Sequence, residues 1–96
     1  MHLVILHLSP TAGAAHQSIE PADARHVLQA RAEPTEALEH LSARRAARGL
    51  DVGLFYRTGT EESARDRAER LARRAVADTP IFAGWRIDDI TRGALR

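Results

Sequence analysis

The segment HLVILHL, residues 2–8, decides the fold that the sequence predicts. Its apolar side chains fall on both sides of an extended chain, with Val4, Leu6 and Leu8 on one side and Leu3 and Ile5 on the other. This pattern is typical of an interior strand in a sheet with two covered faces. We therefore expect a central strand, covered by helices on both sides, or by helices on one side and a partner chain on the other.

The composition is that of a single globular domain, residues 1–96, with 44% hydrophobic and 28% charged residues. The absence of cysteine excludes disulfides, thiolate metal sites and a cysteine nucleophile, and it is compatible with a reducing compartment. No apolar run is long enough to cross a bilayer, and the first strand lacks the basic flank of a signal peptide. The bias toward alanine and arginine is typical of GC-rich bacterial genomes. We expect a bacterial cytoplasmic protein without membrane contact.

The charges are balanced, with 14 basic and 13 acidic residues and a net charge of +1. All the basic residues are arginine, and acidic residues interleave them, as on a solvated, ion-paired surface. This balance makes nucleic acid an improbable partner. The absence of lysine also excludes Schiff-base chemistry and the lysines of phosphate-binding loops and kinases.

The segments that follow the first strand are less clear. After a loop over 9–24, the segment 24–33 fits a strand that Pro34 ends, although Pro21 followed by Ala-Asp would also open a helix. We favour the strand. The next segment, 35–48, predicts a helix that Gly49 terminates.

The second half of the chain gives stronger patterns. Residues 50–57 are rich in strand formers. An amphipathic helix follows, started by Thr58 or Thr60 and stopped by Pro80, with small apolar residues on one stripe: Ala64, Ala68, Leu71, Ala72, Ala75 and Val76. Residues 81–90 predict a last strand, and a flexible tail begins at about residue 91.

These elements predict an α/β fold, with an α+β two-layer sandwich as the alternative. The fold has one small four-stranded sheet and two main helices in the order β-β-α-β-α-β, in which the second strand is exchangeable for a helix. Helices between strands pack on the sheet and connect at least one pair of strands by a crossover.

A ligand site is expected if the strands run parallel, because polar residues at their carboxyl ends would then meet at one edge. The candidates are Ser9, Arg57, Thr58 and Asp88. The loop after the first strand has one glycine and matches no phosphate-binding motif, which favours a plain connection over a ligand cradle.

Catalytic candidates are weak. His7, at the end of a buried strand, and Asp88 are the side chains best suited to acid–base chemistry. The five histidines lack metal-ligand spacing. We therefore expect no metal and no cofactor.

A partner surface is the leading expectation. Two slim helices leave apolar sheet surface uncovered, and a second chain is the simplest cover. We expect contacts from the helix arginines Arg70, Arg73 and Arg74 and from the strand aromatics Tyr56 and Trp85. The predicted function is a noncatalytic interaction or dimerisation module, which forms a homodimer or binds a protein encoded nearby. The alternatives are a small-molecule or nucleotide-binding domain and a small α/β enzyme.

Overall fold

The computed structural model describes residues 2–11, 18–33, 37–57 and 59–93. The elements in chain order are β1 (His2–Pro10), α1 (Pro21–Arg31), β2 (Leu38–Ala46), β3 (Gly49–Tyr56), α2 (Glu61–Asp78), the 3-10 turn η2 (Pro80–Phe82) and β4 (Trp85–Arg92). They form one four-stranded sheet in the order β2-β3-β1-β4, in which every neighbouring pair is antiparallel. This is a small α+β fold, within the class that the sequence predicts.

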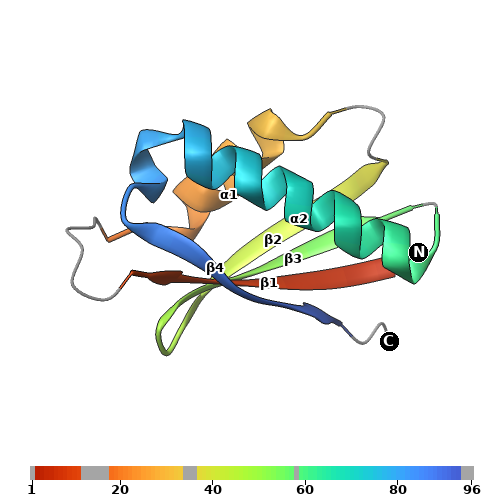
Figure 1. Ribbon diagram of the computed structural model, residues 1–96, viewed down its shortest axis with the longest axis horizontal. Helices are drawn as coiled ribbons and strands as arrows, with labels where there is room; N and C mark the ends of the chain where they lie inside the picture. The colour runs from red at the N-terminus through yellow and green to blue at the C-terminus, as the bar shows by residue number, and fades with distance from the viewer. Residues whose placement is uncertain (1, 12–17, 34–36, 58, 94–96) are drawn as a thin grey trace.

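The topology consists of two β-α-β units, each of which holds a strand of the other between its own two strands. This split arrangement, with the order β-α-β-β-α-β, is that of ferredoxin-like domains. Both helices lie on the same side of the sheet, where α1 contacts β2, α2 contacts β1 and β4, and the helices contact each other (Figure 1). We call the opposite side of the sheet the open face.

β1 is the interior strand that its sequence predicts, since it pairs with β3 on one edge and β4 on the other. Its residues Val4, Leu6 and Leu8 are buried beneath the helices, beside the core residues of β3: Leu50, Val52, Leu54 and Tyr56. Leu3 and Ile5 lie on the open face and remain half-buried. The core therefore occupies a single layer between the sheet and the two helices.

α2 follows the predicted stripe, of which Val76 is half-buried and the other members are buried: Ala64, Ala68, Leu71, Ala72 and Ala75. Thr60 starts the helix with a capping box, in which its Oγ1 accepts a hydrogen bond from the Ser63 amide (3.0 Å) and its own amide donates to Ser63 Oγ (2.9 Å). Thr58, the other predicted cap, lies outside the described residues. Small side chains on the buried stripe allow the helix to lie close to the sheet.

Two assignments between β1 and β3 are wrong. The segment 24–33, predicted as a strand, lies mostly in α1, and 35–48, predicted as a helix, contains β2. In α1 the pair Ala24 and Leu28, one helical turn apart, is buried. In β2 only Leu41 is buried and both arginines are exposed, because an edge strand is covered less than an interior strand. Sheet pairing overrides the helical propensity of this alanine- and arginine-rich segment.

The boundaries of the last strand also differ from the prediction. Residues 80–82 form the turn η2 instead of strand, and β4 runs to Arg92. Residues 91 and 92 of the predicted tail therefore pair with β1, whereas 94–96 lie outside the described residues.

Gly49, predicted to end a helix, instead begins β3 directly after the hairpin turn at residues 47–48. A Cβ at this position would overlap the carbonyl oxygen of Leu8. The hairpin thus approaches β1 at a distance that only glycine allows.

We predict that Gly49→Ala destabilises the fold by about 2–3 kcal/mol, because strand backbones would have to move apart. Urea denaturation measures this free energy. Arg48→Ala, one residue earlier in the exposed turn, is the control and should change stability by less than about 0.5 kcal/mol. Equal effects of the two substitutions would contradict the close approach.

Candidate functional site

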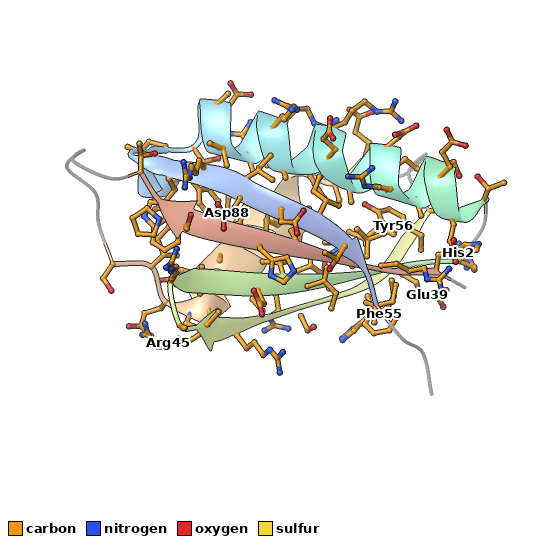
Figure 2. All side chains as sticks on the ribbon, turned by 60° about the horizontal axis from the view of Figure 1, so that its bottom comes forward. His2, Glu39, Arg45, Phe55, Tyr56 and Asp88 are labelled. Carbon is orange, nitrogen blue, oxygen red and sulfur yellow. The ribbon has the colours of Figure 1, made fainter. Side chains whose placement is uncertain are left out.

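The open face carries a cluster of apolar side chains on the side of the sheet opposite the two described helices. Leu3 pairs with Phe55 across β1 and β3, and Ile5 lies two residues along β1, opposite Gly53. We call Leu3, Ile5 and Phe55 the apolar patch, and all three are half-buried. The ring of His40 lies beside Phe55, with 5.6 Å between the ring centroids. In Figure 2, Phe55 extends from the side of the sheet away from α2. The patch is continuous across the two central strands.

A row of polar residues crosses the same face beside the patch. Arg44 on β2, Asp51 on β3, His7 on β1 and Asp89 on β4 are successive cross-strand neighbours. We call these four residues the polar row. His7 Nδ1 lies 2.7 Å from Asp51 Oδ1, and Arg44 lies 3.8 Å from the other carboxylate oxygen. The row carries charges of both signs and ends in an arginine at one edge and an aspartate at the other.

His7 links the carboxylate of Asp51 to a hydroxyl. Because a carboxylate only accepts hydrogen bonds, Nδ1–H donates to Asp51, and Nε2, 3.2 Å from Thr91 Oγ1, accepts from that hydroxyl. Hydroxyl, imidazole and carboxylate thus have the connectivity of a catalytic triad. A triad also needs a concave site and donors for an oxyanion, whereas these residues lie on the surface of a sheet. The arrangement orients the His7 ring, which was a catalytic candidate from the sequence.

The predicted strand-end site is not assembled, because its premise of parallel strands is wrong. Ser9 lies near the carboxyl end of β1 and Arg57 follows β3, and because these two strands are antiparallel, the two residues lie at opposite ends of the sheet. Asp88 is near Ser9, in a bulge of β4 between Ile87 and Asp89, and it contacts Arg86 at 3.3 Å. Arg57 lies 3.9 Å from Glu39 at the other end. Thr58 is outside the described residues.

The predicted partner residues are divided between surface and core. Tyr56 is fully buried and Trp85 is 7% exposed, so neither side chain offers a docking surface. The aromatic that faces outward is Phe55, the neighbour of Tyr56 on the opposite side of the strand. Alternation along β3 was the signal that could have distinguished them.

The helix arginines remain on the surface, where acidic groups partly neutralise two of them. Arg73 lies 3.3 Å from Glu69, and Arg74 lies 3.7 Å from Glu33. Arg70 is exposed on the same helix. This pairing reduces the positive potential that the sequence suggested for the three arginines together.

A groove of about 620 Å³ runs between α2 and the edge strand β4. Its charged lining residues are three arginines and three acids: Arg65, Arg73, Arg86, Glu69, Asp88 and Asp89. The signs balance, so the groove has no net preference for an anion or a cation.

Nowhere in the described ranges do three or more His, Asp or Glu side chains gather in a way that could hold a metal ion. Within the same residues, no helix is long and apolar enough to cross a membrane.

Compared with protein-family models, curated proteins and solved structures, the chain shows no match to any of them. The ferredoxin-like topology hosts many unrelated functions and therefore carries no function by itself. The most distinctive surface of the described residues is the open face, with its apolar patch beside the polar row.

We predict that His7 and Asp51 are energetically coupled by about 1 kcal/mol, because their side chains are only 34% and 20% exposed. A double-mutant cycle with His7→Ala and Asp51→Ala, measured by urea denaturation at one protein concentration, gives this energy. Arg45 and Glu20 form the matched control, with the same 2.7 Å separation but 57% and 67% exposure. Their coupling should be about 0.3 kcal/mol. Equal coupling in the two pairs would contradict a role for burial.

Proposed function

We propose that this protein is a noncatalytic interaction module of a bacterial cytoplasmic system, and that it binds its partner through the open face of the sheet. The observation that carries the proposal is the apolar patch. Leu3, Ile5 and Phe55 adjoin one another on a face without helices, where part of their surface stays in contact with water. Removing such surface from water is favourable by about 25 cal/mol per Å².

The surroundings of the patch support the same function. Protein interfaces combine a central apolar cluster, often with an aromatic residue, and a polar border that sets orientation. Here Phe55 supplies the aromatic, and the polar row supplies hydrogen-bonding and charged groups on one side. His7 is held by Asp51 and Thr91, so little side-chain freedom is lost when it makes a contact.

The partner we favour is a second copy of this chain. A two-fold dimer uses the same patch twice, so it covers apolar surface on both molecules at once. Because the polar row holds both signs of charge, two copies can meet without placing like charges together. A protein encoded nearby is the alternative occupant.

Substitution at the centre of the patch tests this proposal. Ile5→Glu should weaken self-association at least tenfold, because it places a carboxylate where apolar contacts form. Sedimentation equilibrium over a range of concentrations measures the association constant, and circular dichroism checks that the variant is folded.

Ile81→Glu is the matched control, since Ile81 is also half-buried but lies on the turn η2 in the helical layer. This variant should associate like the unmodified protein. A protein that stays monomeric up to millimolar concentration would refute self-association, and equal weakening by both substitutions would place the contact elsewhere.

A further inference from the structure

We propose that two copies stack open face against open face about a two-fold axis that runs parallel to β1, between β1 and β3. This inference rests on the proposed function and specifies its geometry. It comes from the register of the sheet, which places the side chains of the open face in rows across the strands.

Three consecutive rows cross the open face in the strand order β2, β3, β1, β4. The first is His40, Phe55, Leu3 and Gly93; the second is Ser42, Gly53, Ile5 and Thr91; the third is the polar row, Arg44, Asp51, His7 and Asp89. When a row is followed from β4 to β2 instead, its residues occur in the reverse order.

An axis parallel to the strands stacks each row on its own reverse. It places β1 over the partner's β3 and β2 over the partner's β4, at the same height along the strands. Two stacked sheets lie about 10 Å apart with their strands within about 30° of each other, so rows near the axis stay aligned. The side chains at the row ends bridge the remaining offset.

The apolar rows are complementary in size under this operation. Ile5 lies over the partner's Gly53, where the partner's Ser42 and Leu3 side chains border the space above the glycine, and Phe55 lies over the partner's Leu3. At the edges, the ring of His40 lies over the partner's Gly93, beside which the side chain of the partner's Leu3 lies. Large side chains thus meet small ones or flexible ones, which is how two sheet faces interdigitate.

The polar row is complementary in charge at its two ends, where an arginine meets an aspartate. Arg44 lies over the partner's Asp89, and Asp51 lies over the partner's His7. The Arg44 side chain is 79% exposed and long enough to reach across to the opposite sheet. Because the dimer is two-fold symmetric, each of these pairs occurs twice in it.

The other axis that keeps the strands aligned runs across them, through the row of Ile5. It would place Phe55 over the partner's Asp51 and Arg44 over the partner's His40. Apolar side chains would then cover a carboxylate, and Arg44 would have no acidic residue opposite it in the partner. The register therefore favours the axis parallel to the strands.

Cross-linking distinguishes the two axes. Because the chain has no native cysteine, only the introduced cysteines react with the cross-linker. Single variants Ser42→Cys and Thr91→Cys are made with different tags, mixed, allowed to exchange subunits and treated with a short bis-maleimide. Stacked sheets are too far apart for a direct disulfide. The parallel axis predicts a link between the two different variants and little linking within either one. Links within each variant alone would overturn this axis.

A charge exchange gives an independent test. Arg44→Asp and Asp89→Arg should each weaken the dimer about tenfold, because each places like charges opposite one another. The double variant R44D/D89R restores opposite charges and should associate within a few-fold of the unmodified protein. Arg48→Asp, an exposed arginine in the turn beyond the three rows, is the control and should have no effect.

The outcomes separate the geometry from the function. Dimerisation with no rescue in the double variant overturns the parallel axis but leaves association through the open face. A dimer that gives neither kind of cross-link and ignores Ile5→Glu overturns both. The combination of mixed links and charge rescue establishes the stacking.

Discussion

The position of β1 between two strands constrains the rest of the structure. β1 pairs with β3 along one edge and with β4 along the other, β2 pairs with the far edge of β3, and both helices cross the same side of the sheet. Alternate residues of β1 are then buried at Val4, Leu6 and Leu8. The residues between them are left on the face that the helices do not reach, and the candidate surface follows directly from this.

The strong parts of the sequence pattern describe the structure well. The apolar run at 2–8 predicts an interior strand because its apolar residues fall on both sides of an extended chain, and the stripe of α2 predicts a helix because its period of 3.6 residues is clear over its whole length. The segments between β1 and β3 have no such period. Leu28 and Leu41 are the main core residues of α1 and β2, and one large apolar residue per element cannot distinguish a helix from an edge strand. The sequence analysis therefore predicts a strand where α1 lies and a helix where β2 lies.

The site shows the same division between local and non-local information. An uncovered apolar face was expected from Leu3 and Ile5, whose alternation is a property of one strand. The cross-strand partners of Leu3 and Ile5 were not expected, because they depend on the register of the sheet, which involves Gly49, Gly53 and the bulge at Asp88. The sequence identifies His7 as a candidate by its residue type alone. Its hydrogen-bond partners, Asp51 and Thr91, lie 44 and 84 residues away along the chain. No spacing of residues along the sequence predicts such long-range contacts.

The two outer strands have a consequence for assembly at high concentration. Strands at the border of a sheet can recruit another border by backbone pairing and so grow into filaments. β2 carries exposed Arg44 and Arg45, and β4 carries exposed Arg86 and Asp88, with Asp88 in a bulge that interrupts the regular ladder. Charge and irregularity therefore discourage edge-to-edge polymerisation. The described borders of this sheet are therefore poorly suited to the addition of further strands.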